Sequence, residues 1–204
     1  MKSNLSQRTI SRLTQYHCIV TAMEDEGKDV VSSPQIAELL NIDDSQIRKD
    51  MKILGKTGKT KVGYSVKETK KLIEKILGFE KTKDAFVVGA GNLGLAIAKY
   101  EDFKYYGINI LAMFDTDPLK INLTYNEKQV HHISKLPELA KEKKVEIAVL
   151  TVPRKFAQET ADFIIQSGIK YIWNFTPTVL KLPDDIKVWN ENLIGNFLQF
   201  TKDI

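Results

Sequence analysis

At positions 89 to 94 the chain reads Gly89-Ala90-Gly91-Asn92-Leu93-Gly94. An apolar run at 85–88 precedes this segment, and a helical pattern follows it from Leu95. A GxGxxG turn between a strand and a helix is the form that places a dinucleotide pyrophosphate on a helix N-terminus. We expect these six residues to bind such a cofactor. The alternative is a glycine turn in a domain of the same fold that binds no nucleotide.

Strands and helices alternate along the chain from Lys83 onward. Strands are expected at 85–88, 108–114, 130–131, 147–151, 171–173 and 187–189, and helices at 93–99, 136–141 and 156–167. This alternation with apolar strands predicts an α/β fold class, with a parallel sheet covered on both faces in a Rossmann-like domain. We assign residues 81–189 to that domain.

An acidic residue ends the second expected strand, about 20 residues after the last glycine of the turn. A carboxylate at that place bonds the adenosine ribose hydroxyls, so we predict this role for Asp115, with Asp117 as the alternative. No Arg stands beside Asp115, which favours NAD(H) over NADP(H). Strand ends in this fold face the ligand, so Thr151-Val152-Pro153 and Asn174 are further cofactor candidates, or simply Pro-containing loops.

The first 80 residues predict a different domain. Helices expected at 6–26, 34–40 and 45–54 have the order of a helix-turn-helix. The later helix of that motif enters the major groove of DNA through its N-terminal residues, which here are Ser45, Gln46, Arg48 and Lys49. A glycine-punctuated segment at 55–64 follows and resembles a β-wing. Its lysines, with one from the preceding helix, could reach phosphate: Lys52, Lys56, Lys59 and Lys61.

Charge supports the DNA-binding interpretation. Between Ser45 and Lys75 there are ten Lys or Arg and three Asp or Glu, whereas the whole chain carries a net charge of only +4. The alternative is an ordinary three-helix domain with a solvated polar hairpin. The remaining features exclude several classes of protein. The chain has a single Cys, so no internal disulfide is expected, and no Cys/His spacing indicates a metal site. No apolar run has the length of a membrane span or the pattern of a leader, so a cytoplasmic protein is expected.

An oxidoreductase is a weaker interpretation of the same glycine turn. Hydride transfer to a carbonyl needs a proton donor beside the nicotinamide, and none of the three histidines is placed for it. Tyr100 and Lys104 have the Tyr-x-x-x-Lys spacing of short-chain dehydrogenases, but they follow the first helix and not the fourth strand. The last residues, 190–204, form an apolar helix that needs a partner, either its own domain or a second copy of the chain.

The order of these motifs over nearly the whole chain resembles the redox-sensing transcriptional repressor family Rex. The motifs are the helix-turn-helix, the basic wing, the GAGNLG turn, Phe114-Asp115-Thr116-Asp117-Pro118, Thr151-Val152-Pro153 and the terminal helix. The resemblance implies a homodimer that binds a palindromic double-stranded operator and is released by NADH, whereas NAD+ permits binding. It also implies control of fermentative or anaerobic metabolism and a terminal helix, 190–204, exchanged between subunits.

Further site residues follow from the resemblance alone. It implies that Tyr100 lies near the nicotinamide and that Leu193 lies against the partner's nicotinamide pocket. Arg12, Tyr16, Ser32 and Ser33 match positions of the family's DNA-binding half.

Two positions depart from the family pattern. Asn192 stands where the family has an Asp that can pair with the partner's tyrosine, and Thr60-Lys61 replaces an Arg-Gly of the wing. The alternative function is therefore a related DNA-binding regulator with an altered nucleotide response or operator preference.

Overall fold

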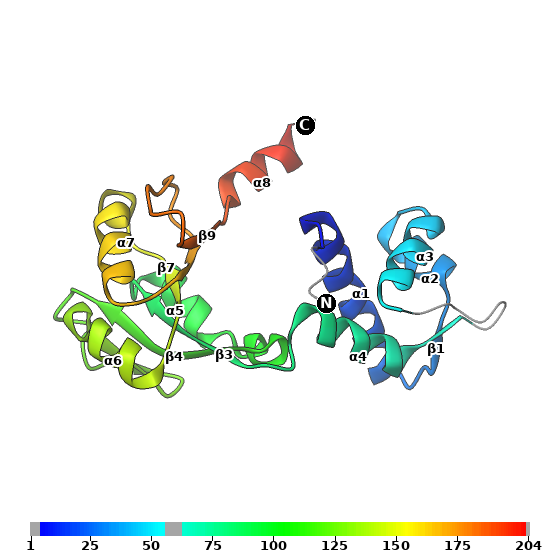
Figure 1. Ribbon diagram of the computed structural model, residues 1–204, viewed down its shortest axis with the longest axis horizontal. Coiled ribbons are helices and arrows are strands. Elements are labelled where there is room, and N and C mark those ends of the chain that lie inside the picture. Colours follow the sequence, from blue (N-terminus) through cyan, green and yellow to red (C-terminus); the bar gives the residue numbers. More distant parts are fainter. Residues whose placement is uncertain (1–4, 56–62, 203–204) are drawn as a thin grey trace. The chain divides into compact units, whose positions relative to one another are not determined.

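The computed structural model of the protein describes residues 5–55 and 63–202. The chain folds into two compact units, Met1–Lys81 and Thr82–Ile204, whose elements are labelled in Figure 1. No helix in the described ranges has the length and apolarity that a membrane crossing requires.

Four helices and a small antiparallel ribbon make up the N-terminal unit. The elements are α1 (Gln7–Asp25), β1 (Val30–Val31), α2 (Ser33–Leu40), α3 (Asp44–Ile53), β2 (Tyr64–Ser65) and α4 (Val66–Leu77). β1 pairs with β2 in this ribbon, and most of the expected wing, residues 56–62, lies outside the described residues. The helix order and the ribbon give the expected winged helix-turn-helix arrangement.

Capping residues set the starts of α2 and α3. The helix α2 is capped by Ser32, because the side chains of Ser32 and Gln35 each accept a hydrogen bond from the other's backbone N–H in a capping box. Asn41 ends α2 in the left-handed region, with φ of 51°, and Asp43 then caps α3 through a 2.7 Å bond from the Ser45 N–H. This sharp connection turns α3 away from α2 as a helix-turn-helix requires.

The second unit is built on a seven-stranded sheet in the order β5-β6-β4-β3-β7-β8-β9. The parallel strands are β3 (Lys83–Val88), β4 (Ile108–Asp115), β6 (Lys128–His132), β7 (Ile147–Leu150), β8 (Tyr171–Asn174) and β9 (Lys187–Asn190). The short β5 (Thr124–Tyr125), which was not predicted, pairs antiparallel with β6 in a hairpin at the edge. The chain order reverses between β3 and β7, and a crevice for ligands forms at such a switch point.

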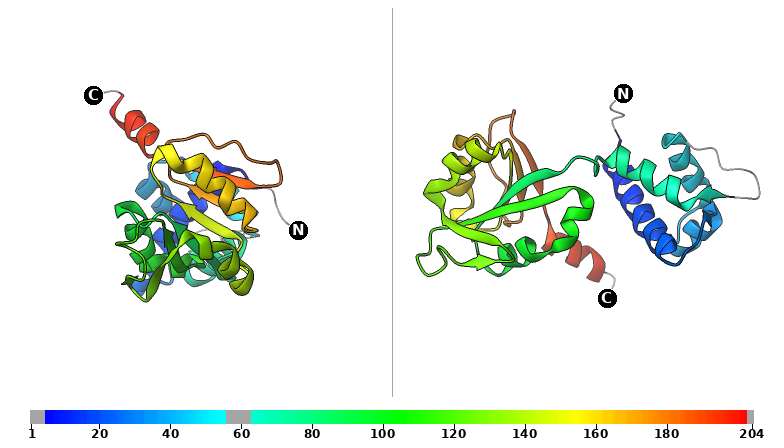
Figure 2. Two further views of the ribbon diagram at one scale, coloured as in Figure 1. Left: turned by 90° about the vertical axis from the view of Figure 1, so that its left-hand side faces the viewer. Right: turned by 90° about the horizontal axis from the view of Figure 1, so that it is seen from below.

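Helices cover both faces of this sheet, as the views in Figure 2 show. Alternate β3 residues divide between the two faces. Phe86 and Val88 pack in a cluster with α6 (Leu136–Lys143) and α7 (Ala157–Gln166), whereas Ala85 and Val87 pack in a cluster with α5 (Asn92–Lys99). The sheet and its two helical layers confirm the expected α/β, Rossmann-like fold.

The terminal helix α8 (Leu193–Thr201) has no buried residue in the single chain. Just before it, the Oε1 atom of Glu191 accepts hydrogen bonds from both indole groups of the protein, Trp173 Nε1 at 2.8 Å and Trp189 Nε1 at 2.9 Å. Glu191 therefore joins β8 and β9 at the point where α8 begins.

A buried carboxylate joins α1 to α3 in the N-terminal unit. Asp50 is 1% exposed and accepts bonds from Arg12 Nε at 2.6 Å, Arg12 Nη2 at 2.9 Å, Tyr16 Oη at 2.8 Å and Gln46 Nε2 at 3.0 Å. Burial opposes ionisation of Asp50, but the bonds from Arg12 and Tyr16 outweigh it and lower its pKa. The orientation of α3 thus depends on a carboxylate paired with a guanidinium of α1.

Replacing Asp50 with Asn should lower the free energy of unfolding of this unit by about 3 kcal/mol, because Arg12 then loses its counter-ion in a half-buried position. Hydrogen exchange of the α1 and α3 amides reports on this unit separately. Asp44→Asn is the matched control, since its pair with Arg48 spans one exposed helix turn and contributes about 0.5 kcal/mol or less. Equal losses in the two variants would contradict the assignment.

The same pair gives a pH dependence with a defined sign. The pKa of Asp50 is lower in the folded state, so its stabilisation is present above the unfolded pKa of about 4 and is lost as the pH falls through the folded pKa. The wild type should therefore lose more stability below about pH 4 than Asp50→Asn does.

Candidate functional site

The glycine turn between β3 and α5 is built around one carbonyl oxygen, that of Gly89. Gly89 has φ of +106°, which favours glycine, and a Cβ there would lie 2.9 Å from the Thr151 carbonyl carbon. A Cβ on Gly94 would overlap the Gly89 oxygen. The Thr151 hydroxyl donates to that same oxygen at 2.8 Å. Gly89 and Gly94 are therefore required by the protein's own packing.

The middle glycine of the turn differs from the other two. A Cβ on Gly91 would meet nothing within 4 Å, so the protein itself does not require glycine there. Gly91 is the N-cap residue of α5 and has no side chain to bond the first N–H groups of that helix. These N–H groups and the open space beside them suit the close approach of an anion such as a pyrophosphate.

Asp115 at the end of β4 is bonded directly to this turn. Its Oδ2 atom accepts from the Ala90 N–H at 2.8 Å, and its Oδ1 atom accepts from the N–H groups of Thr116 and Asp117 at 2.8 and 2.9 Å. Lys120 Nζ lies 3.2 Å from Oδ2. Burial alone would raise the pKa of Asp115, but the bonds from the Asp117 and Ala90 N–H groups and from Lys120 outweigh it and lower the pKa, so the group is ionised at neutral pH.

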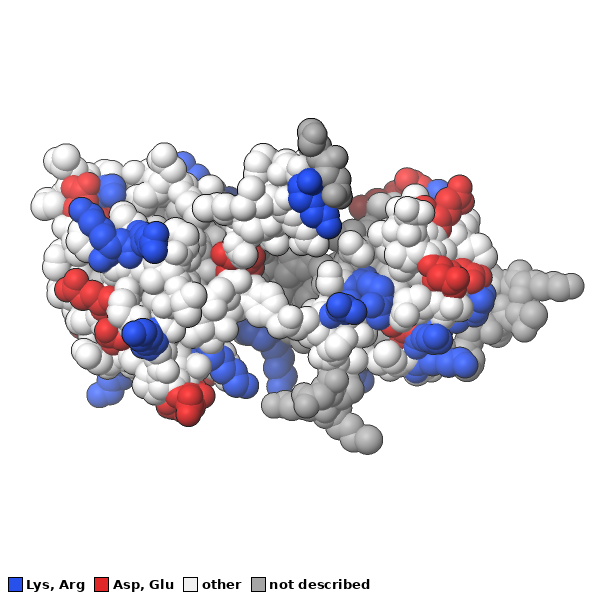
Figure 3. All heavy atoms as spheres, turned by 90° about the horizontal axis from the view of Figure 1, so that it is seen from above, with Lys and Arg blue, Asp and Glu red and all other residues white. Residues whose placement is uncertain are grey.

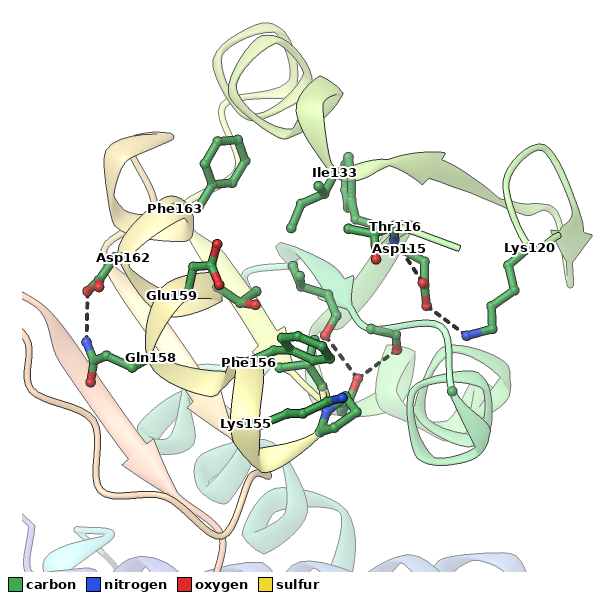
Figure 4. Close-up of a pocket in the computed structure, with 18 of the residues that line it drawn as sticks. Asp115, Thr116, Lys120, Ile133, Lys155, Phe156, Gln158, Glu159, Asp162 and Phe163 are labelled. Carbon is green, nitrogen blue, oxygen red and sulfur yellow. Dashed lines mark hydrogen bonds and ion pairs between the residues drawn. The ribbon is translucent and has the colours of Figure 1, made fainter. Parts of the chain in front are cut away.

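A cavity of about 1230 Å³ opens at the carboxyl ends of β3, β4 and β7, which is room for a ligand larger than most drug-sized molecules. Figure 4 shows Asp115 and Lys120 on one side of it and side chains of α7 on the other. The predicted residues that line it are Gly89, Gly91, Asp115, Thr151, Val152 and Pro153. The less favoured Asp117 does not line it, and its side chain accepts from the Leu119 N–H in the following turn.

Sequence reasoning missed the wall of the cavity formed by α7 and by Ile133. These lining residues include Lys155, Phe156, Gln158, Glu159, Asp162 and Phe163. Lys155 and Phe156 lie in the short 3-10 turn Arg154–Phe156 that precedes α7, and the other four belong to α7 itself. The inner face of α7 packs on the sheet, so its apolar periodicity reveals the buried side of the helix and not the residues that line the cavity. The sequence signal that could have identified them is their position just after the strand β7, which borders the switch point of the sheet.

Seven of the predicted cofactor residues are not among those that line this cavity: Ala90, Asn92, Leu93, Gly94, Tyr100, Asn174 and Leu193. Asn174 is fully buried, and its side chain bonds Thr178, Asn190 and Thr176, so it organises the loop after β8. Tyr100 is 52% exposed and packs edge-to-face on Phe103 at 5.0 Å. Phe103 continues this aromatic row to Trp173, with ring centroids 5.8 Å apart. Tyr100 thus lies at the end of a row that leads toward Glu191.

The terminal helix presents a continuous apolar surface. Its exposed side chains are Leu193, Ile194, Phe197, Leu198 and Phe200, which are 55 to 76% exposed. Asn192 caps this helix, because its Oδ1 atom accepts from the Gly195 N–H at 2.9 Å. Exposed apolar area of this kind is typical of a protein–protein contact.

The residues predicted to bind DNA fall into two groups. Ser45, Arg48, Lys49 and Lys52 are exposed on α3 and available to a ligand. Arg12 and Gln46 are committed to Asp50, Ser32 caps α2, and Tyr16 and Ser33 are buried. Tyr16 and Ser33 therefore cannot make the surface contact expected of them, because the core of the unit covers both side chains. The lysines at 56, 59 and 61 lie outside the described residues.

Positive charge is not gathered into one continuous patch on the face seen in Figure 3. There, Lys and Arg side chains of the N-terminal unit are interspersed with Asp and Glu. Some basic residues of this unit are also paired with acidic ones, as Lys70 is with Glu24 at 2.6 Å. The exposed basic residues of α3 are therefore the more specific candidates for phosphate contact than the overall charge.

Comparison with known proteins finds two family models that match different parts of the chain. Residues 4–51 match a family model described as "Putative DNA-binding protein N-terminus", and residues 80–178 match one described as "CoA binding domain". The redox-sensing transcriptional repressor Rex of Treponema denticola is 43% identical, over 93% of this chain and 90% of its own length. Rex of Carboxydothermus hydrogenoformans is 40% identical, over 98% and 96%.

Solved structures agree with these relatives. The repressor RSP in complex with β-NAD+ and operator DNA has a TM-score of 0.90 at 34% identity, over 98% of this chain and 93% of that one. RSP in complex with β-NADH has a TM-score of 0.88 at 33% identity, over 98% and 94%. Identity at this level, sustained over both units, shows that the chain belongs to the Rex family of redox-sensing transcriptional repressors.

Proposed function

We propose that this protein is a homodimeric repressor that binds a palindromic operator and is released from it by NADH. The observation that carries the proposal is the glycine turn bonded to Asp115 in a chain that also holds a winged helix-turn-helix. The related RSP has been crystallised with β-NAD+ and operator DNA and with β-NADH, which supports the same ligands here. A regulator of fermentative or anaerobic genes acts in the cytoplasm, where its DNA and its cofactor pool are.

In this proposal the cofactor lies across the switch point between β3 and β7. The N-terminus of α5 and Gly91 bind the pyrophosphate, and Asp115 binds the adenosine ribose. Thr151 to Pro153 lie beside the part of the cofactor that extends beyond the glycine turn. Asn174 acts indirectly, by holding the loop after β8. Tyr100 is assigned to the nicotinamide end together with Leu193 of the partner subunit.

For DNA, the proposal assigns contact to the exposed residues of α3. Arg48 and Ser45 are suited to base edges or phosphate, and Lys49 and Lys52 to phosphate. Arg12, Tyr16 and Gln46 act through Asp50, which fixes the orientation of α3. The lysines at 56, 59 and 61 are assigned to the backbone of the DNA.

In this proposal the protein binds and senses the cofactor and does not use it in a reaction. The support for this is that the similar proteins are named transcriptional repressors. NADH can shift the equilibrium between a DNA-binding and a released dimer only by its difference in affinity for the two. The alternative, an altered nucleotide response, is motivated by Asn192, whose amide caps α8 without carrying the charge of an Asp.

The proposal is tested by titrating a palindromic operator at fixed salt, with NADH and NAD+ added separately. We expect NADH to weaken DNA binding and NAD+ to leave it intact or strengthen it. Salt is held constant because phosphate contacts make the affinity strongly salt-dependent. Equal effects of the two redox forms would reject the sensing function and favour the alternative.

The glycine turn offers a matched pair of variants. Gly94→Ala should destabilise the second unit by about 1 to 3 kcal/mol, because its Cβ overlaps the Gly89 oxygen. Gly91→Ala should leave the melting temperature unchanged but weaken NADH binding by about tenfold or more, because the added methyl group faces only the ligand. Thermal denaturation and calorimetric titration separate the two effects. A Gly91→Ala protein with unchanged affinity would place the pyrophosphate elsewhere.

The exposed face of α8 predicts the oligomeric state. The double substitution Ile194→Glu and Leu198→Glu should dissociate the dimer, because charge would replace the apolar area that the partner covers. Sedimentation analysis measures the mass directly. Val179→Glu is the control, since Val179 is 87% exposed but lies outside α8. A dimer that survives the double substitution would assign the subunit contact to another surface.

A further inference from the structure

Lys120 occupies a position in the cavity that the sequence pattern did not predict. Its Nζ atom lies 3.2 Å from Asp115 Oδ2 and 3.6 Å from Asp117 Oδ2, as Figure 4 shows for Asp115. The absence of an Arg beside Asp115 in the sequence favours NAD(H). A cation nevertheless lies beside this carboxylate, five residues further along the chain.

The acceptor capacity of Asp115 is fully used by protein donors. A carboxylate has about four lone-pair positions, and Asp115 accepts from three backbone N–H groups and from Lys120. The backbone donors belong to the glycine turn and to the segment just after β4, so they cannot leave without breaking that local structure. Lys120 has a flexible stem and a side chain that is 36% exposed. A ribose hydroxyl can therefore bond Asp115 only by displacing Lys120.

The displaced ammonium has a nearby second acceptor. Asp117 is already 3.6 Å away, and its side chain is 39% exposed. A lysine held there remains beside the ribose and presents a positive charge to the ribose hydroxyl side of the cavity. That charge opposes the effect of Asp115, which repels a phosphate on the ribose.

We propose that Lys120 determines the nucleotide preference of this site: it competes with the ribose hydroxyls for Asp115 and offers a cation to a phosphate on that ribose. This inference rests on the proposed function, because it assumes that a nicotinamide dinucleotide binds the cavity. Its consequence is a smaller discrimination between NADH and NADPH than Asp115 alone would give.

The test is calorimetric titration of the full-length protein with NADH and with NADPH. Lys120→Met keeps the length of the side chain and removes its charge. We expect this variant to bind NADH about fivefold more tightly, because the competing ion pair is worth about 1 kcal/mol, and to bind NADPH more weakly. Lys120→Arg keeps the charge and should retain the wild-type binding of NADPH. Lys170→Met is the control, since its pair with Glu146 is exposed and outside the cavity.

The outcomes separate the two proposals. A wild-type protein that binds neither dinucleotide would overturn the proposed function and this inference with it. A wild type that binds NADH, with an unchanged ratio of NADH to NADPH affinity in Lys120→Met, would overturn the role of Lys120 alone. Weaker binding of both dinucleotides by Lys120→Met would also overturn it, because Lys120 would then be a general attractant for phosphate.

Discussion

The carbonyl oxygen of Gly89 is the point on which the second unit depends. The Thr151 hydroxyl donates to it, and the lack of a side chain on Gly94 leaves the space that it fills. Together these interactions hold the start of α5 against the end of β7. The same turn presents the Ala90 N–H to Asp115, so the two groups proposed to bind the pyrophosphate and the ribose are joined by a backbone hydrogen bond. The shape of this glycine turn is therefore required by the packing of the protein itself, whether or not a ligand is bound.

The N-terminal unit fixes the orientation of its helix α3 by side-chain bonds and not by backbone packing. Asp50 of α3 bonds Arg12 and Tyr16 of α1 and is also bonded by Gln46 of its own helix, and the orientation of α3 follows from that network. One unit fixes its functional surface with backbone and glycine, the other with a buried ion pair. If α3 contacts DNA as proposed, Arg12 and Tyr16 contribute to DNA binding by positioning that helix through Asp50.

Much of this architecture could be predicted from sequence, because its signals are local. The apolar strands, the glycine spacing and Asp115 are read within single segments, and the α/β fold follows from them. Long-range pairing leaves no such signal: Arg12 and Asp50 are 38 positions apart, so the sequence predicts Arg12 as a DNA contact and not as the partner of a buried carboxylate. The burial of the Asn174 side chain and the contact of Lys120 with Asp115 both depend on the conformation of loops, which the local sequence does not predict.

The shared bond of the two tryptophans to Glu191 has a spectroscopic consequence. The chain has two Trp residues, and both indole N–H groups meet one carboxylate oxygen at the base of α8. The intrinsic fluorescence of the protein therefore originates at a single place, beside the aromatic row that ends at Tyr100. Because reduced nicotinamide absorbs light in the range where indole emits, energy transfer gives this protein an optical signal of its own that requires no added dye.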